Sequence, residues 1–341
     1  MHILVTGGAG YIGSHVIKQL LEYTNYDITI IDNLSTGYQR TIDTLKQIAS
    51  SSSNGTLQFY HADLADFKGI EKIFLSNHFD AVIHFAASIV VPESVENPLK
   101  YYMNNTVNTT NLIHLCNQYN VGKFLFSSTA AVYGEPSETP VKETTPTNPI
   151  NPYGMSKLMS ERILQDASEV NPNFSFVILR YFNVAGADIK NRIGQSFPNA
   201  THLIKVSAQT VIGQREKLSI FGDDYDTYDG TCIRDYIHIE DLASAHISAL
   251  HYLEANHVNN IFNCGYGHGF SVREVVETMK DVSETDFTIE VVPRRAGDPA
   301  LLIADNMKIK NTLNWEPKFD NLKLICTTAL NWEKEMILHE I

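Results

Sequence analysis

The segment Val5–Gly13, with the sequence Val-Thr-Gly-Gly-Ala-Gly-Tyr-Ile-Gly, constrains the fold of this chain more than any other. Apolar residues 3–5 predict a short buried strand before the glycines, and residues 11–21 have the apolar periodicity of a helix. The turn between them places a helix N-terminus, with its unpaired N–H groups and the positive end of its dipole, where it can bind an anion. The segment therefore predicts the start of a βαβ unit that binds the pyrophosphate of a dinucleotide.

Asp32 ends the second predicted strand, residues 27–32, roughly 20 residues after the glycine turn. A carboxylate at this place accepts hydrogen bonds from the adenosine ribose and repels the 2′-phosphate that distinguishes NADP from NAD. The next residues, Asn33, Leu34 and Ser35, supply no cation for such a phosphate. A glycine-rich turn also occurs in α/β proteins that bind no nucleotide, but the position of Asp32 favours a dinucleotide site, and we expect NAD.

Four later apolar runs alternate with helical patterns, at residues 57–60, 81–86, 123–127 and 174–181. Alternation of this kind predicts an α/β fold with a Rossmann-type doubly wound parallel sheet and helices on both faces. A polar run at residues 50–55 predicts a loop before the third strand.

The regular alternation weakens in the second half of the chain. We therefore expect an NAD-binding Rossmann domain at residues 1–183 and a smaller C-terminal α/β region at residues 184–341. The second region would mainly bind the substrate, and segments of it can return to the first domain. Its predicted elements are helices at residues 202–212, 239–253, 271–282 and 322–335, with short strands around Phe262 and Ile289.

Charge and hydropathy argue against two classes of partner. The chain of 341 residues carries 26 basic and 39 acidic residues, a formal net charge of −13, and no basic run, so we expect no nucleic-acid partner. An anionic substrate would need locally placed arginines. No basic leader precedes the first strand, and no apolar stretch approaches the length of a membrane span, so we expect a cytoplasmic protein without a membrane partner.

The cysteines and histidines show no spacing that is typical of metal ligands. Cys116, Cys232, Cys264 and Cys326 are scattered and form no Cys-x-x-Cys pair, which favours buried thiols over a disulfide framework. The 13 histidines are not paired at ligand spacing either. We therefore expect no metal site.

Tyr153 and Lys157 are four residues apart and follow Asn151-Pro152, which predicts a helix start. Both side chains would therefore lie on one helical face. An ammonium one turn away, together with the positive charge of a bound nicotinamide, would lower the pKa of Tyr153 toward working pH. Tyr153 could then act as a general base, although a surface helix pair is the ordinary alternative for this spacing.

Thr129 completes the predicted catalytic group. It ends the polar run Ser127–Thr129, which follows an apolar strand at the sheet edge where catalytic groups collect. Its hydroxyl would hydrogen-bond the reacting oxygen and shorten the proton path to Tyr153. The hydroxyls of this run can instead cap the strand, and we favour that role for Ser128.

Several motifs along the chain together resemble one family. They are Thr6-Gly7-x-x-Gly10-x-x-Gly13, the set Thr129, Tyr153 and Lys157, Asn104-Asn105, Arg180-Tyr181-Phe182-Asn183, Arg234-Asp235-Tyr236-Ile237-His238, and Arg294-Arg295-x-Gly297-Asp298. Their combination resembles the UDP-glucose 4-epimerase family of the extended short-chain dehydrogenases, over nearly the whole chain. The resemblance implies that NAD stays bound while a hydride leaves C4 of a UDP-hexose and returns to the opposite face of a 4-keto intermediate. It also implies a homodimer that pairs through helices at residues 97–119 and 152–170.

The resemblance assigns residues to two binding sites. Implied cofactor contacts are Gly7, Gly10, Tyr11, Ile12, Asp32, Asn33, Asp63, Leu64, Phe85, Ala86, Ala87, Asn104, Tyr153, Lys157 and Phe182. Implied UDP-sugar contacts are Asn183, Phe221, Arg234, Arg295 and Asp298. The planar guanidinium groups suit a diphosphate, and the acidic chain needs such local charge. We leave out Arg294, for which a surface ion pair is expected, and a core position is an alternative for Phe221.

Three positions depart from the family pattern. Ile89 stands where a lysine near the cofactor is expected, and Thr201-His202 replaces an asparagine pair that touches the nucleotide or sugar. Leu302 occupies the place of a bulky tyrosine found in glucose-restricted members. A wall without that ring could admit an N-acetyl group, so we expect UDP-N-acetylglucosamine and UDP-N-acetylgalactosamine as additional substrates.

Three alternative functions remain open at this point. A nucleotide-sugar 4,6-dehydratase shares the first oxidation, but Ala130-Ala131 stands where dehydratases carry an Asp-Glu pair after the threonine. A nucleotide-sugar 4-reductase would release oxidised cofactor in each cycle, whereas an epimerase needs no added nucleotide. A non-catalytic NAD sensor would not require the intact set Thr129, Tyr153 and Lys157.

Overall fold

The computed structural model describes residues 1–52, 55–199, 201–295 and 298–338. Within it the chain forms two compact units. The first comprises Met1–Val132, Thr147–Arg180 and Ala243–Phe262, and the second comprises Tyr133–Pro146, Tyr181–Leu242 and Asn263–Ile341. Residues 133–146 thus group with the second unit and residues 243–262 with the first, so the division is not a single cut in the chain.

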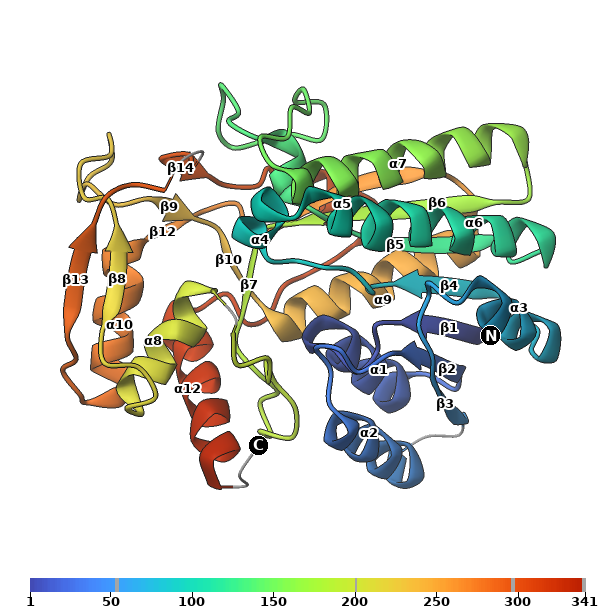
Figure 1. Ribbon diagram of the computed structural model, residues 1–341, viewed down its shortest axis with the longest axis horizontal. Helices are drawn as coiled ribbons and strands as arrows, with labels where there is room; N and C mark the ends of the chain where they lie inside the picture. Colours follow the sequence, from blue (N-terminus) through green and yellow to red (C-terminus); the bar gives the residue numbers. More distant parts are fainter. Residues whose placement is uncertain (53–54, 200, 296–297, 339–341) are drawn as a thin grey trace. The chain divides into compact units, whose positions relative to one another are not determined.

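A seven-stranded sheet forms the centre of the first unit (Figure 1), in the order β11-β6-β5-β4-β1-β2-β3. Its strands are β1 (His2–Thr6), β2 (Asp27–Asp32), β3 (Leu57–His61), β4 (Ala81–His84), β5 (Lys123–Thr129), β6 (Ser175–Tyr181) and β11 (Asn260–Cys264). The pairs β1·β2, β2·β3, β1·β4 and β4·β5 are all parallel. All seven residues of β6 are buried, as in a sheet that helices cover on both faces. The predicted Rossmann-type sheet is confirmed.

Helices surround this sheet. They are α1 (Tyr11–Tyr23), α2 (Gln39–Ser52), α3 (Phe67–Ser76), α4 (Val91–Glu96), α5 (Pro98–Tyr101), the π-helix η1 (Tyr102–Val107), α6 (Asn108–Gln118), the short 3-10 helix η2 (Ala130–Tyr133), α7 (Pro152–Val170) and α9 (Ile239–Asn256). Helix α1 packs on α2, and α6 packs on both α3 and α7, with α6 and α7 running side by side in Figure 1.

The predicted loop at residues 50–55 is wrong for its first part. Ser50 and Ser51 continue helix α2, and their hydroxyls donate to the carbonyls of Gln47 and Ile48 one turn back. Serine can bond to the backbone in this way at a helix end, so a polar run does not by itself end a helix. The rest of that run includes residues 53 and 54, which lie outside the described residues.

Apolar side chains from strands and helices form a core cluster in the first unit. Phe124 on β5 and Ile178 on β6 cluster with Phe74 of α3, Leu112 of α6 and Leu164 of α7. Burial of each such side chain contributes about 1.5–3 kcal/mol. This packing fixes α7 against the ends of β5 and β6, which determines where Tyr153 and Lys157 lie.

The second unit is built from smaller sheets and four helices. Strand β7 (Asn183–Ala185) pairs with β10 (Tyr236–His238), β9 (Ile233–Arg234) pairs with β12 (Phe270–Ser271) and β14 (Leu301–Leu302), and β8 (Leu218–Phe221) pairs with β13 (Ile289–Val292). Its helices are α8 (Leu203–Val211), α10 (Val272–Ser283), α11 (Met307–Leu313) and α12 (Leu322–Leu338). The helices and short strands expected in this part of the chain are therefore present.

A local signal explains where helix α10 of the second unit begins. Helix α10 starts with a capping box, in which the Ser271 hydroxyl accepts from the Glu274 N–H and the Glu274 carboxylate accepts from the Ser271 N–H. Leu218 and Ile220 of β8 pack with Val276 of α10 in the adjoining core.

Among the helices of the described residues, none has the length and hydropathy that a membrane span requires.

Candidate active site

The glycine turn between β1 and α1 leaves an open helix N-terminus. Gly7 has φ +73°, and a Cβ there would lie 2.6 Å from the backbone nitrogen of Ala86. Gly10 is the N-cap of α1 and provides no side-chain cap for its N–H groups. The first N–H groups of α1 therefore have no acceptor on the side chain of the N-cap residue. This arrangement fits the pyrophosphate of a dinucleotide.

Asp32 is fixed at the end of β2 by two backbone hydrogen bonds. Its carboxylate accepts from the N–H of Ala9 at 2.9 Å and from the N–H of Leu34 at 2.8 Å. Burial raises the pKa of Asp32, and these two bonds act in the opposite direction. A carboxylate offers about four lone-pair sites, so acceptor capacity remains for ribose hydroxyls.

The other residues expected to contact a cofactor in the first unit gather at the same sheet edge. The parallel strands β1, β2, β3 and β4 end together there, and the N–H of Phe85 donates to the carbonyl of Thr6 at 3.0 Å. Asn33 donates to the Asp63 carboxylate at 2.8 Å, and Asn104 of η1 donates to the Ser88 hydroxyl at 3.0 Å. The remaining positions are Tyr11 and Ile12 in the first turn of α1, Leu64 after β3, and Ala86 and Ala87 after β4.

Two further residues named from the sequence are Phe182 and Ile89. Phe182 follows β6 and belongs to the second unit, so its contact with the cofactor stays a prediction. Ile89 lies after β4 in the first unit, with 47% of its surface exposed. An exposed isoleucine supplies no hydrogen bond, which agrees with the expected loss of a polar contact at this position.

Helix α7 brings Tyr153 and Lys157 onto one face. The Asn151 side chain caps the helix by accepting from the Gly154 N–H at 2.8 Å, with Pro152 in the first helical position. The Tyr153 hydroxyl is hydrogen-bonded with the Thr129 hydroxyl at the end of β5. The structure therefore brings together the three residues predicted as the catalytic group.

Burial dominates the electrostatics of this group. It lowers the pKa of Lys157 to about 7, while the Glu161 carboxylate opposes that change. It raises the pKa of Tyr153, and the hydrogen bond with Thr129 opposes that change. Within the chain alone the pKa of Tyr153 thus moves opposite to the predicted direction, which had included the charge of a bound cofactor.

A buried histidine lies beneath this edge. His84 Nδ1 is 2.6 Å from the Thr6 hydroxyl and its Nε2 is 2.7 Å from the Thr109 hydroxyl. Burial and the nearby Lys157 ammonium lower the pKa of His84 to about 3, so the ring is neutral. The Thr109 hydroxyl donates to the carbonyl of Asn105 in η1. His84 therefore donates to Thr109 and accepts from Thr6.

Sequence reasoning missed Glu161 next to the catalytic group, and it named Arg180 only as part of a motif, without a role. Arg180 of β6 donates to both carboxylate oxygens of Glu161 on α7, and the pair is buried. The Ser128 hydroxyl donates to the same carboxylate at 2.5 Å, so its predicted role as a strand cap is wrong. The four-residue step from Lys157 to Glu161 was a usable signal, because it continues the face that Tyr153 begins.

The arginines of the second unit lie beside one aromatic ring and one carboxylate. Arg295 places its guanidinium carbon 3.6 Å from the ring centroid of Phe221, and Arg234 forms an ion pair with Asp298. Leu302 of β14 is the register partner of Arg234 on β9. All five residues were predicted as substrate contacts. Arg295 thus contacts Phe221, Arg234 contacts Asp298, and Leu302 lies opposite Arg234 on the neighbouring strand.

Arg294 forms the surface ion pair expected for it. Its guanidinium donates to the Asp224 carboxylate at 2.6 Å and lies 4.1 Å from the ring centroid of Tyr225. Both charged side chains are largely exposed. Gly297, which was part of the quoted motif, lies outside the described residues.

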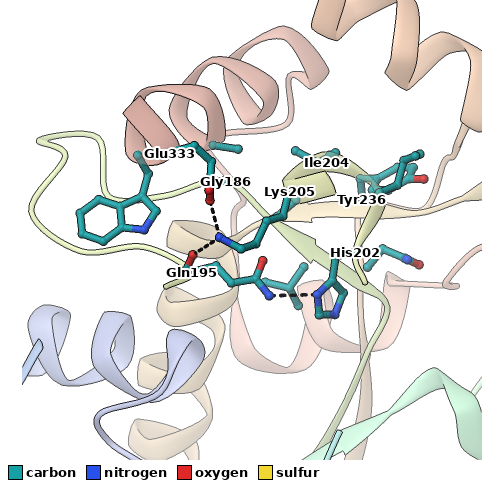
Figure 2. A pocket seen from close by; sticks show the side chains of 13 residues that line it. Gly186, Gln195, His202, Ile204, Lys205, Tyr236 and Glu333 are labelled. Atoms are coloured by element: carbon teal, nitrogen blue, oxygen red, sulfur yellow. Dashed lines mark hydrogen bonds and ion pairs between the residues drawn. The ribbon is translucent and has the colours of Figure 1, made fainter. Parts of the chain in front are cut away.

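Asn183, the remaining predicted substrate contact, lines a pocket together with His202 (Figure 2). The Gln195 amide donates to His202 Nδ1 at 2.9 Å, and the Lys205 ammonium donates to the Gln195 carbonyl at 2.7 Å and to the Glu333 carboxylate. Surrounding atoms and the Lys205 ammonium lower the pKa of His202, although part of its ring is open to solvent. A neutral His202 in this arrangement carries its proton on Nε2.

Comparison with known proteins gives consistent matches over nearly the whole chain. Residues 4–328 match the family model described as GDP-mannose 4,6 dehydratase. The chain is 48% identical to UDP-glucose 4-epimerase of Azospirillum brasilense over 334 residues, which cover 98% of this chain and 92% of that protein.

Two solved structures are also similar. The UDP-Glc/GlcNAc 4-epimerase from Campylobacter jejuni is 58% identical, with a TM-score of 0.86 and coverage of 98% of this chain and 99% of that one. The UDP-glucose 4-epimerase from Bifidobacterium longum in complex with NAD+ and UDP is 36% identical, with a TM-score of 0.92 and coverage of 98% of each chain.

Substitution of Gly10 should separate folding from dinucleotide binding. Its φ of −77° suits any residue, and an added Cβ would meet only the Gly7 carbonyl, at 3.2 Å. We expect Gly10→Ala to keep its free energy of unfolding within about 1 kcal/mol of the parent, but to raise the dissociation constant for NAD at least ~10-fold. Urea unfolding and fluorescence titration with NAD measure the two effects.

Gly7→Ala is the matched control, because its Cβ would collide with the backbone of Ala86 and its φ is positive. It should lower the free energy of unfolding by about 1–3 kcal/mol. A folded Gly10→Ala variant that bound NAD as tightly as the parent would contradict the assignment of the α1 N-terminus.

Proposed function

Because the chain belongs to the UDP-glucose 4-epimerase family, we propose that it is an isomerase that inverts C4 of UDP-hexoses with NAD as a bound cofactor. Its substrates are UDP-glucose and UDP-galactose. The observation that carries the proposal is the group of Thr129, Tyr153 and Lys157, held together at the sheet edge where the glycine turn also lies. A general base beside a dinucleotide site is what removal of hydrogen from a sugar hydroxyl requires.

The first unit supplies residues that fit NAD. The open N-terminus of α1 would hold the pyrophosphate, and Asp32 would accept hydrogen bonds from the adenosine ribose. The carboxylate disfavours a 2′-phosphate, which supports NAD over NADP. Bound NAD would supply the reversible hydride acceptance at C4 of the sugar that inversion without net oxidation requires. The chain contributes the proton transfer and the orientation of the sugar.

Tyr153 is the general base and acid in this proposal. Its phenolate takes the proton of the C4 hydroxyl and returns it to the same oxygen after the sugar has rotated to present its opposite face. Thr129 hydrogen-bonds the reacting oxygen and shares the proton with Tyr153. The Lys157 ammonium, which donates to the Ser127 carbonyl at 2.9 Å, supplies the positive charge that favours the phenolate.

The second unit supplies the residues proposed to hold the UDP-sugar. The guanidinium groups of Arg234 and Arg295 suit a diphosphate, and Phe221 offers a ring beside the uracil. Asp298 and Asn183 supply polar groups for the ribose and the sugar. His202 shares the Asn183 pocket, and its Nε2–H would take the donor role of the asparagine that it replaces.

The match to a dehydratase family model raises dehydration as a second candidate. Elimination across C5 and C6 needs an acid and a base beside the sugar ring. The residues directly after Thr129 are Ala130 and Ala131, and neither can transfer a proton. We therefore place epimerisation first.

We propose that the protein forms a homodimer through α5, η1 and α7. These elements pack against one another in the first unit and expose Leu99, Met103, Val107 and Met159. Several exposed large apolar side chains on elements that pack together suit an association surface. Light scattering should give twice the chain mass of 38.3 kDa, and a mass equal to a single chain would contradict the proposal.

We also place the protein in the cytoplasm. The cysteines Cys116, Cys232, Cys264 and Cys326 are all free and buried. Free thiols suit a reducing compartment. Fractionation of the producing cells checks this placement.

Tyr153→Phe should abolish turnover but leave the cofactor bound. The phenylalanine keeps the ring and loses the proton-transfer group, so kcat for conversion of UDP-galactose to UDP-glucose without added NAD should fall at least ~100-fold. The dissociation constant for NAD should remain near that of the parent. A parent that binds NAD but converts no UDP-hexose would favour the sensor function, and unchanged turnover in the variant would contradict the role of Tyr153.

Leu302→Tyr should narrow the substrate range. The parent is expected to interconvert UDP-N-acetylglucosamine and UDP-N-acetylgalactosamine, since leucine leaves room beside the sugar that a tyrosine ring would fill. We expect kcat/KM for the acetylated sugars to fall at least ~10-fold in the variant, with that for UDP-glucose retained. Undetectable turnover of the acetylated sugars by the parent would end the proposal of a dual range.

A further inference from the structure

The end of strand β5 is bonded to helix α7 at three consecutive residues. Tyr153, Lys157 and Glu161 are spaced four apart on α7, so their side chains lie along one face. Each of them is paired with one residue of the segment 127–129. The pairs are the Tyr153 hydroxyl with the Thr129 hydroxyl, the Lys157 ammonium with the Ser127 carbonyl at 2.9 Å, and the Glu161 carboxylate with the Ser128 hydroxyl at 2.5 Å.

The third pair depends on a charge from another strand. Arg180 of β6 donates through Nε to Glu161 Oε1 at 3.0 Å and Oε2 at 3.2 Å, and through Nη2 to Oε2 at 2.5 Å. The Glu161 side chain is 0% exposed and that of Arg180 is 5% exposed. A carboxylate that is fully removed from water needs such a charged, multiply bonded partner to remain ionised. Arg180 therefore fixes both the charge and the orientation of the Glu161 carboxylate.

We propose that Glu161 and Arg180 are positioning residues for the reaction. Together they hold Ser128, and with it Thr129, in register with Tyr153. The Glu161 carboxylate also provides the negative charge that keeps Lys157 protonated. The inference rests on the proposed function. Neither residue touches the reacting atoms in this account. Glu161 acts through Ser128 and Lys157, and Arg180 acts through Glu161.

The charges around Lys157 support this role. Burial lowers the pKa of Lys157 to about 7, and Glu161 is the group that opposes the change. The Lys157 ammonium also lies 5.0 Å from the ring centroid of Phe126. Titratable groups on the elements packed around it include the neutral His84 on β4, Arg180 on β6, Tyr153 on α7 with Tyr101 of α5 beside it, and the mutually paired Glu93 and Lys100 on α4 and α5.

Removal of the Glu161 charge has a definite sign. Without it the ammonium loses its opposing carboxylate, so the pKa of Lys157 falls further and more of the lysine is neutral at working pH. A neutral lysine no longer favours the phenolate, so the pKa of Tyr153 rises. The acid limb of the rate profile should therefore move to higher pH.

The test uses the full chain with Glu161→Gln and Arg180→Met combined, since removing both charges leaves no stranded ion in the core. Circular dichroism establishes that the double variant folds. The acid limb is the rise of kcat/KM for UDP-galactose with pH. We expect its midpoint to move up by about one pH unit, so that kcat/KM at a pH below the midpoint falls ~10-fold. Arg180→Lys keeps a cation beside Glu161, and this conservative variant should retain the parental limb. A folded double variant with the parental limb would overturn the proposal.

A second readout does not depend on turnover. Tyrosinate absorbance at 295 nm, measured for each NAD-loaded protein and for the same NAD-loaded protein carrying Tyr153→Phe, isolates the titration of Tyr153 by difference. Its midpoint should lie higher in the double variant than in the parent, and equal midpoints would contradict the proposal. A parent that epimerises nothing would defeat the proposed function, while this titration would still decide the role of the pair.

Ser128→Ala tests the positioning link by itself and decides the matter if the double variant does not fold. It removes one hydroxyl and keeps the Glu161–Arg180 pair. We expect kcat to fall about 3- to 10-fold with KM and the acid limb unchanged, because alignment of Thr129 is lost while the charge remains. Parental kcat in a folded Ser128→Ala variant would overturn the link through Ser128.

Discussion

The burial of the Lys157 ammonium is the constraint on which the sheet edge with Thr129 and Tyr153 depends. The residue is 3% exposed and its charge must be compensated within the protein. The ammonium donates a hydrogen bond to the Ser127 carbonyl, and Glu161 opposes the effect of burial on the pKa of Lys157. Loss of a partner from a buried charge costs about 3–5 kcal/mol, so the surrounding groups are held in place as strongly as the lysine itself.

The same constraint accounts for the neutral state of the groups beneath Lys157. A second cation next to the ammonium would be unfavourable, and the His84 ring is neutral between two threonine hydroxyls. Those hydroxyls belong to Thr6, which precedes the glycine turn, and Thr109, which donates to the π-helix at Asn105. The Asn105 amide in turn donates to Ser156 on α7 at 3.0 Å. A continuous buried network of hydrogen bonds therefore joins the end of β1 to the helix that carries Tyr153.

The second unit meets a different electrostatic requirement. A chain with a net charge of −13 attracts an anionic nucleotide sugar only where cations are concentrated. Arg234 is held by Asp298 and Arg295 lies on the ring of Phe221, so both guanidinium groups have defined positions. A planar group that is already ordered loses little freedom on binding a diphosphate. The proposed function thus places substrate affinity mainly in the second unit and proton transfer in the first.

Local sequence determined the glycine turn, the place of Asp32 at the end of a strand, and the shared helical face of Tyr153 and Lys157, because backbone conformation and helical period fix these relations within a few residues. It also determined the alternating strands and helices of the sheet. Only the tertiary structure decided which groups meet across the fold. Glu161 is hydrogen-bonded to Ser128, which is 33 positions away in the sequence, and to Arg180, which is 19 positions away. His84 is hydrogen-bonded to Thr6, which is 78 positions away. Such partners are chosen by strand order and core packing, which no local pattern records.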